Sequence, residues 1–229
     1  MPGVIAHNLF HRVGDLRTGV DVLRDVSIEA PAGQVTAVVG PAGSGKTSLL
    51  HLLAGLDRPA AGTVTLDGRP LRGLDDLELT RLRRDRIGLL LPAASVLPTI
   101  TVRENVALPL LIARRAPEPE AVDALLERVG LEDVRDEKPG ALTAPQRQRA
   151  ALARALVGGP SVLLADEPAG DLEPEDGAEL LLLLREIAHE DGIAVVLFTR
   201  DVDDAAGAAD RIIELQAGRV VAPAAPLAA

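Results

Sequence analysis

Short runs of apolar residues recur along the chain and are separated by longer segments with helical spacing of apolar positions. The runs at residues 35–39, 162–165 and 194–198 are apolar at nearly every position, which is typical of parallel strands buried on both faces. Residues 87–91 and 211–215 form two similar runs. Strands that alternate with helical segments predict an α/β domain.

Two further segments follow a different pattern. Residues 26–29 and 63–66 alternate between apolar and polar positions, as half-exposed antiparallel strands do. The sequence therefore predicts a mixed sheet with an antiparallel edge.

The stretch between residues 97 and 140 contains no convincing strand run. Residues 102–115 and 118–129 instead show helical spacing on either side of Pro117, which predicts two helices. We therefore expect one domain over residues 1–222, with a helical subdomain at about 93–157 inserted in the α/β core. The Ala- and Pro-rich residues 223–229 are expected to form a disordered tail.

Composition narrows the classes of function. The 229 residues are 47% hydrophobic, with no Cys and only two aromatics, Phe10 and Phe198, which excludes a disulfide scaffold and thiolate metal sites. The net charge of −10 disfavours a nucleic-acid partner, so a phosphate ligand needs a locally prepared site. The longest uncharged stretch, residues 87–102, is shorter than the roughly 20 residues that span a bilayer. With no signal-peptide pattern at the N-terminus, we expect a cytoplasmic location.

The strongest chemical motif is GPAGSGKT at residues 40–47, between a predicted buried strand and a predicted helix. Its glycines allow backbone N–H groups to turn toward phosphate oxygens, and the helix N-terminus adds partial positive charge. Lys46 is predicted to reach the β- and γ-phosphates and Thr47 to coordinate Mg²⁺. The alternative, a glycine-rich turn with a solvated lysine, is disfavoured by this context. The predicted nucleotide-binding residues here are Gly40, Pro41, Ala42, Gly43, Ser44, Gly45, Lys46, Thr47 and Ser48.

A second motif ends the predicted strand at residues 162–165. Asp166 and Glu167 follow it directly, and a strand-end Asp holds magnesium in phosphate-loop ATPases. Glu167 is the candidate general base for the attacking water. The alternative is a pair of solvated acids at an exposed strand end.

With both motifs placed, residues 4–221 resemble the nucleotide-binding domain of ABC transporters, and most closely its lipoprotein-release and macrolide-export branch. Three segments carry the resemblance, VLRDVSIEAPAGQVTAVVGPAGSGKTSLLHLLAGLDRPAAGTVTLDG, RRDRIGLLLPAASVLPTITVRENVALPLL and LTAPQRQRAALARALVGGPSVLLADEPAGDLEPEDG. The resemblance implies ATP and Mg²⁺ as ligands and a head-to-tail dimer, formed with an identical or a different ATP-binding subunit. It also implies a separate membrane permease and a peripheral position on the inner face of the cell membrane.

The resemblance breaks at several nucleotide-contacting positions. Val13 stands before Gly14 where the family has an aromatic residue that stacks on adenine, and stacking contributes roughly 1–3 kcal/mol. His11 shares a face with Val13 if the segment is extended, and is otherwise a solvated loop residue. Pro92 replaces the family's Gln, which removes the amide side chain and a backbone N–H.

The signature segment and the switch position also differ. Residues 142–146 read Leu-Thr-Ala-Pro-Gln where the family has Leu-Ser-Gly-Gly-Gln; Thr143 keeps a hydroxyl that could donate to a γ-phosphate, but Pro145 lacks a backbone donor. Arg200 replaces the family's His and would clamp the γ-phosphate or lock ATP in an unreactive state. Its alternative is a surface ion pair with Asp201 or Asp203. At residue 173 the family usually has Asp, and Glu173 is a milder change than those above.

Together these features predict an ATP-binding subunit of an ABC transporter complex with reduced hydrolysis, because removing one preorganised donor costs about 10²–10³ in rate. A non-hydrolytic regulatory or scaffold protein acting on a membrane partner is the alternative, and a fully active ATPase with substitute residues is a third. Residues 102–115 are either a permease-docking surface or a core-facing helix stripe.

Overall fold

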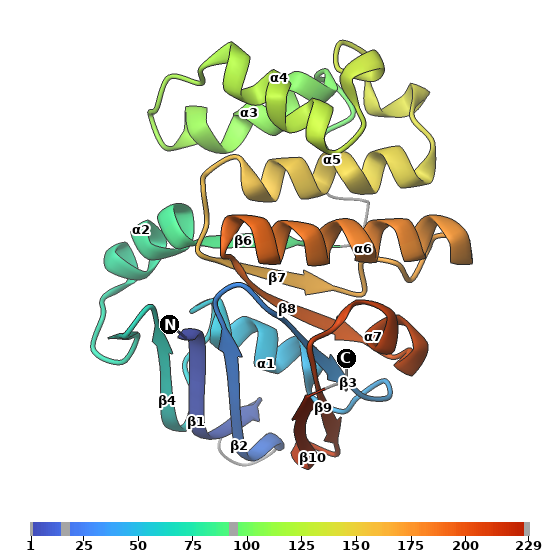
Figure 1. The fold of residues 1–229 in the computed structure, drawn as a ribbon. Coiled ribbons are helices and arrows are strands. Elements are labelled where there is room, and N and C mark those ends of the chain that lie inside the picture. The colour runs from blue at the N-terminus through green and yellow to red at the C-terminus, as the bar shows by residue number, and fades with distance from the viewer. Residues whose placement is uncertain (1, 15–18, 92–95, 227–229) are drawn as a thin grey trace.

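The computed structural model describes residues 2–14, 19–91 and 96–226. The described chain begins with three strands, continues with interspersed helices and strands, and ends with two strands (Figure 1). The strands are β1 (Pro2–Val13), β2 (Val20–Pro31), β3 (Val35–Val39), β4 (Ala61–Leu66), β5 (Arg69–Pro70), β6 (Ile87–Leu90), β7 (Val162–Asp166), β8 (Ala194–Thr199), β9 (Arg211–Gln216) and β10 (Arg219–Pro226). The α-helices are α1 (Lys46–Leu53), α2 (Asp76–Arg86), α3 (Val102–Ile112), α4 (Pro119–Arg128), α5 (Ala144–Leu156), α6 (Pro174–Asp191) and α7 (Val202–Ala208), with 3₁₀ turns η2 (Glu132–Val134) and η3 (Pro139–Ala141).

The central sheet has the strand order β10-β9-β3-β8-β7-β6. Strands β9, β3, β8, β7 and β6 are parallel, and β10 adds an antiparallel edge. The remaining strands form a second sheet, β2-β1-β4-β5, whose pairings are antiparallel. The α/β fold with a mixed sheet is therefore confirmed, and the alternating segments 26–29 and 63–66 lie in the antiparallel sheet.

Alternate residues of the parallel strands face two different apolar layers. Val38, Leu164 and Phe198 pack with helix α1 and the antiparallel sheet. Ala37 and Leu163, on the opposite face, pack with α5, α6 and α7. Covering the sheet on both faces explains why its strands are apolar at nearly every position.

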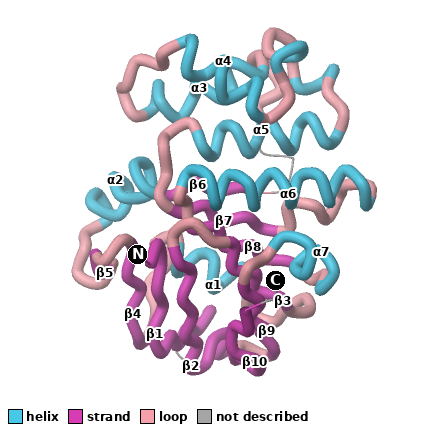
Figure 2. The backbone as a smooth tube through the Cα atoms, in the orientation of Figure 1, coloured by secondary structure: helices cyan, strands magenta, loops and turns pink. Residues whose placement is uncertain are grey.

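Helices α3 and α4 lie beyond α5, away from the antiparallel sheet (Figure 2), and share a separate apolar core with α5. Two capping boxes fix helix starts: the Glu104 N–H donates to Thr101 Oγ1 and the Gln146 N–H to Thr143 Oγ1, with reciprocal bonds from the Thr101 and Thr143 amides. The predicted helices at 102–115 and 118–129 thus correspond to α3 and α4, each ending slightly earlier.

Strand β10 extends into the segment 223–229, which is expected from the sequence to be a disordered tail. Strand β10 continues to Pro226 and pairs antiparallel with β9, with Ala225 opposite Ile212. Proline is tolerated in β10 because it is an edge strand. No further strand pairs with its outer side, so the N–H that proline lacks is not needed for a hydrogen bond there. Residues 227–229 lie outside the described residues.

No helix in the described part of the chain has the length and apolar content needed to cross a membrane.

The two phenylalanines provide a matched test of this packing. Phe198 is fully buried in β8, whereas Phe10 in β1 is 42% exposed. We expect Phe198→Ala to lower the free energy of unfolding by about 3–5 kcal/mol, since it leaves a cavity in the core. Phe10→Ala should cost about 1 kcal/mol or less. Urea unfolding followed by circular dichroism measures both; equal losses would contradict the layered core.

Candidate functional site

The carboxyl ends of three neighbouring parallel strands build the candidate site. Strand β8 lies between β3 and β7, with Val39 opposite Thr199 and Asp166 opposite Phe198. The Gly40 N–H donates to Thr199 O at 3.2 Å, and the Glu167 N–H donates to Phe198 O at 2.8 Å. The loop after β3, the carboxylates after β7 and Arg200 after β8 therefore meet at one edge, where ligands of open α/β sheets bind.

The loop between β3 and α1 depends on glycine. Gly43 and Gly45 have φ angles of 76° and 108°, a left-handed conformation that costs glycine little. At Gly40 a Cβ would collide with the Leu215 carbonyl oxygen, so this position also requires glycine. The Ser44 N–H donates back to Pro41 O at 3.2 Å, which closes the turn just before α1 begins.

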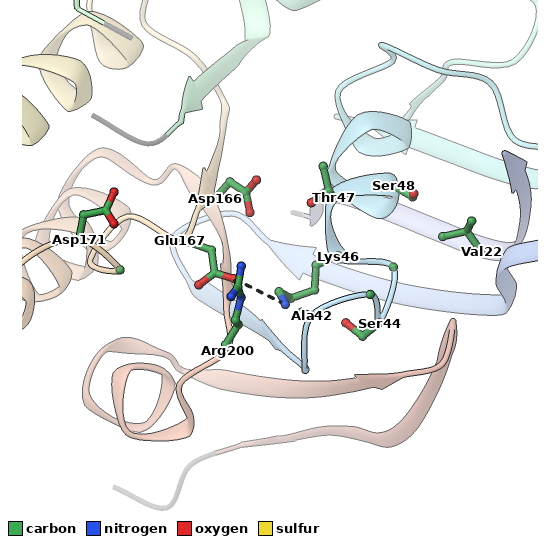
Figure 3. Close-up of a pocket in the computed structure, with 13 residues that line it drawn as sticks. Val22, Ala42, Ser44, Lys46, Thr47, Ser48, Asp166, Glu167, Asp171 and Arg200 are labelled. Atoms are coloured by element: carbon green, nitrogen blue, oxygen red, sulfur yellow. Dashed lines mark hydrogen bonds and ion pairs between the residues drawn. The ribbon is translucent and has the colours of Figure 1, made fainter. Parts of the chain in front are cut away.

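A pocket of about 500 Å³ opens at this edge (Figure 3). It brings together most of the predicted site residues, while Gly40 and Pro41 do not line it and instead accept hydrogen bonds from Lys46 through their carbonyl groups. The lining residues are Val22, Ala42, Gly43, Ser44, Gly45, Lys46, Thr47, Ser48, Asp166, Glu167, Gly170, Asp171 and Arg200.

Lys46 is buried, and its ammonium group is fully engaged with the loop. Its Nζ donates to Gly40 O at 2.6 Å and to Pro41 O at 3.3 Å, and lies 3.6 Å from Glu167 Oε1. The charge that would meet a phosphate is therefore held at the wall of the pocket, between the loop carbonyls and Glu167.

Arg200 pairs with the candidate base rather than with its neighbours in sequence. Its Nε donates to Glu167 Oε1 at 2.8 Å. The suggested partners lie on the following helix, where Asp201 caps α7 by accepting the Asp203 N–H at 2.7 Å. The alternative considered for Arg200, an ion pair with Asp201 or Asp203, is thus replaced by a pair with Glu167.

Asp166 has the environment expected of a magnesium ligand. Burial raises the pKa of its carboxyl group, and the Glu167 charge raises that pKa further, while Lys46, His51 and Arg200 oppose both effects. A cation beside Asp166 would favour the ionised form.

The other polar atoms of the pocket also suit Mg²⁺ bound together with phosphate. Thr47 lines the same pocket, and Ser44 Oγ is buried without a hydrogen-bond partner. Among the described residues no group of three or more His, Cys, Asp or Glu could hold a metal. Mg²⁺ usually takes only one or two carboxylates together with phosphates and water, so this donor set fits.

Two residues considered for adenine contacts lie elsewhere. Val13 is exposed at the end of β1, opposite Val20, and does not line the pocket. His11 is buried, with Nε2 3.4 Å from Asp57 Oδ2, so it is neither a solvated loop residue nor a ring exposed for stacking. The register of β1 shifts between His11 and Arg12, and this irregularity breaks the alternation that placed His11 and Val13 on one face.

The structure shows the places of two of the residues at which the sequence departs from the family pattern, Thr143 and Glu173. Thr143 lies outside the pocket and uses its hydroxyl as the α5 cap, and Glu173 is the exposed residue before α6. Pro92 lies outside the described residues.

Three further lining residues were not predicted. Val22, Gly170 and Asp171 line the pocket. The acidic Asp171, four residues after Glu167, offered a signal, whereas Val22 looks like any apolar residue of an alternating strand.

Comparisons with known proteins agree with this geometry. A family model described as "ABC transporter" matches residues 23–170. The lipoprotein-releasing system ATP-binding protein LolD of Myxococcus xanthus is 42% identical over 203 residues, covering 88% of this chain and 90% of LolD. The macrolide export ATP-binding/permease protein MacB of Bordetella avium is 41% identical over 88% of this chain but only 31% of its own length.

Solved structures share the whole architecture. The ATP-binding cassette MJ0796, determined as a dimer in a post-hydrolysis state with ADP and Pi, superposes with a TM-score of 0.87 at 33% identity over 99% of both chains. CbiO1 from Clostridium perfringens, part of the ABC transporter complex cbiONQ, gives a TM-score of 0.86 at 28% identity over 96% of this chain and 87% of its own.

The phosphate loop, the strand-end carboxylates and these matches lead to one assignment. The chain belongs to the ABC transporter family, as an ATP-binding domain of the type found in the lipoprotein-release and macrolide-export branch.

Proposed function

We propose that this chain binds Mg²⁺–ATP in the pocket at the carboxyl ends of β3, β8 and β7, and couples binding to a separate membrane permease with slow hydrolysis. The observation that carries this proposal is the meeting of the phosphate loop, Lys46 and Thr47 with Asp166 and Glu167 in one pocket. Two motifs about 120 residues apart in the sequence would not converge there by chance.

Different groups of the pocket would bind the phosphates, hold Mg²⁺ and accept the proton of the attacking water. The loop amides and the start of α1 would bind phosphate oxygens, and Lys46 would exchange its carbonyl contacts for the β- and γ-phosphates. Thr47 and Asp166 would hold Mg²⁺, which when bound offsets the phosphate charge. Glu167 would accept a proton from the attacking water, which requires a carboxylate oxygen within hydrogen-bond reach.

Two features support slow hydrolysis. Glu167 Oε1 is engaged by Arg200 and faces Lys46, so the base is restrained. Pro145, in the first turn of α5, lacks the backbone donor that the family presents to the γ-phosphate of the opposite subunit.

An apolar groove of about 470 Å³ supports a membrane partner. It is lined by Leu56, Leu89, Leu108, Pro109 and Ile112 among others. On α3, Val102 and Val106 face the helical core while Leu111 and Ile112 are exposed. One face of helix α3 therefore packs inside, as a core-facing stripe does, and we propose that its exposed face docks a permease at the inner face of the membrane.

The related dimeric cassette supports a dimer with another ABC ATP-binding subunit, identical or different. A second candidate is a role as a regulatory or scaffold protein that does not hydrolyse nucleotide. The ion pair between Arg200 and Glu167 favours it, because this pair engages the candidate general base.

The binding proposal is tested by titrating the purified protein with Mg²⁺–ATP in a calorimeter. We expect Lys46→Ala to weaken binding about 10- to 100-fold, since a hydrogen bond to a charged group contributes about 1.5–3 kcal/mol. Lys138→Ala, at an exposed site before η3, is the control and should bind as the wild type does. Absence of binding at millimolar ATP, unchanged by Lys46→Ala, would refute the proposal.

Base selectivity should be poor, because none of the described residues that line the pocket is aromatic. Without a stacking ring, affinity rests on phosphate and magnesium contacts, and we expect GTP to compete within about tenfold of ATP. Competition binding with a labelled ATP analogue measures the ratio. A strong adenine preference would show that another group holds the base.

Hydrolysis is the third test. We expect slow phosphate release from the wild type that Glu167→Gln reduces by about 10²-fold or more, as loss of a general base does. A colorimetric phosphate assay measures both rates. Phosphate release at ordinary ATPase rates, abolished by Glu167→Gln, would instead identify a fully active ATPase and contradict the reduced rate.

A further inference from the structure

We propose that Arg200 is a positioning residue that restrains the Glu167 carboxylate, so that removing Arg200 raises the rate of ATP hydrolysis. The inference rests on the proposed function and deepens it, because it assigns part of the slow hydrolysis to one side chain. It also gives Arg200 the opposite effect to a γ-phosphate clamp, whose loss would slow the reaction.

Two cations meet at one oxygen of Glu167. Arg200 Nε donates to Oε1 at 2.8 Å, and Lys46 Nζ lies 3.6 Å from the same atom. In Figure 3 Arg200 lies directly beside the Glu167 carboxylate, and a dashed line extends from this contact to Lys46. Charge-assisted hydrogen bonds are the stronger ones in proteins, so this geometry favours one position of the carboxylate.

The backbone holds both ends of the contact in place. Glu167 has a left-handed φ of 46°, and its N–H is bonded to Phe198 O while its own carbonyl accepts the Gly170 N–H at 3.1 Å. Arg200 follows β8 directly, and Thr199 Oγ1 accepts the Asp201 N–H at 3.0 Å next to it. The separation between the two backbones is therefore set by the β7–β8 pairing and not by the side chains.

The guanidinium group of Arg200 can hold the Glu167 carboxylate in place, but it cannot transfer a proton to or from it. Arginine has five donors, no acceptor and a permanent charge, so Arg200 cannot take a proton from Glu167 or pass one on. A base must instead present an oxygen to the attacking water. Because Oε1 accepts from Arg200 and faces Lys46, it is the more engaged of the two oxygens and the less ready to accept that proton.

The restraint is expected to be modest. Arg200 is 64% exposed, whereas Glu167 is 25% exposed, and solvent screens ion pairs of this kind. A phosphate group bound at the loop would also compete for both cations. Removal of Arg200 should therefore change the rate by a few-fold and not by orders of magnitude.

Steady-state hydrolysis of Mg²⁺–ATP by the full chain tests whether removal of Arg200 raises or lowers kcat. We expect Arg200→Ala to raise kcat about threefold to fivefold, in line with the small free energy of an exposed ion pair, with KM for Mg²⁺–ATP nearly unchanged. The increase should vanish in the Glu167→Gln background. Arg58→Ala is the matched control, because Arg58 is 58% exposed and pairs with Asp76 at 2.9 Å, outside the pocket residues. A lower or unchanged kcat in Arg200→Ala would overturn the proposal.

A second measurement does not depend on activity. Without nucleotide, Arg200→Ala should lower Tm by about 1–3 °C, and by less than half as much in the Glu167→Gln background. Additive shifts would mean that Arg200 does not restrain Glu167 and would overturn the proposal. Calorimetric titration keeps the two claims apart: if no variant binds Mg²⁺–ATP, the proposed function fails, while the Tm cycle still decides whether the contact exists.

Discussion

The parallel pairing of β3, β8 and β7 is the constraint on which the rest of the site depends. It aligns Val39 with Thr199 and Asp166 with Phe198, so that three chain segments leave the sheet at the same edge. The loop glycines, the two carboxylates and Arg200 gain their positions from this register. A slip of one residue in any of the three strands would turn the following side chains to the wrong face.

The charge distribution at this edge differs from that of the whole chain. The protein carries a net charge of −10, yet Lys46, Arg200 and the loop amides present positive charge to the pocket. Asp166 and Glu167 are set against these cations, with Asp166 partly desolvated. A polyanion and a divalent cation together match this arrangement, because each would meet groups of the opposite sign. Under the proposed function, this pocket is the locally prepared site that a phosphate ligand needs on an acidic chain.

Much of the fold follows from the sequence, because strands buried on both faces are apolar at nearly every position. Residues 35–39 are predicted to the residue, and the phosphate loop follows from its strand and helix context. Contacts between distant segments do not follow in this way: Arg200 and Glu167 are 33 residues apart in sequence, and acids next to Arg200 were the more obvious partners. The register shift after His11 and the pairing of the Pro-rich strand β10 are likewise set by neighbouring strands rather than by local pattern.

The scarcity of aromatic residues in the chain affects this pocket directly. Val22 is among the lining residues, and no described lining residue has an aromatic ring. Under the proposed function, affinity for the nucleotide then comes from its phosphate end. The most direct test of this account is a crystal structure of Glu167→Gln with Mg²⁺–ATP. The account predicts a triphosphate held by the amides of residues 43–48, with magnesium between Thr47 and Asp166. A nucleotide bound elsewhere, or held mainly through its base, would contradict it.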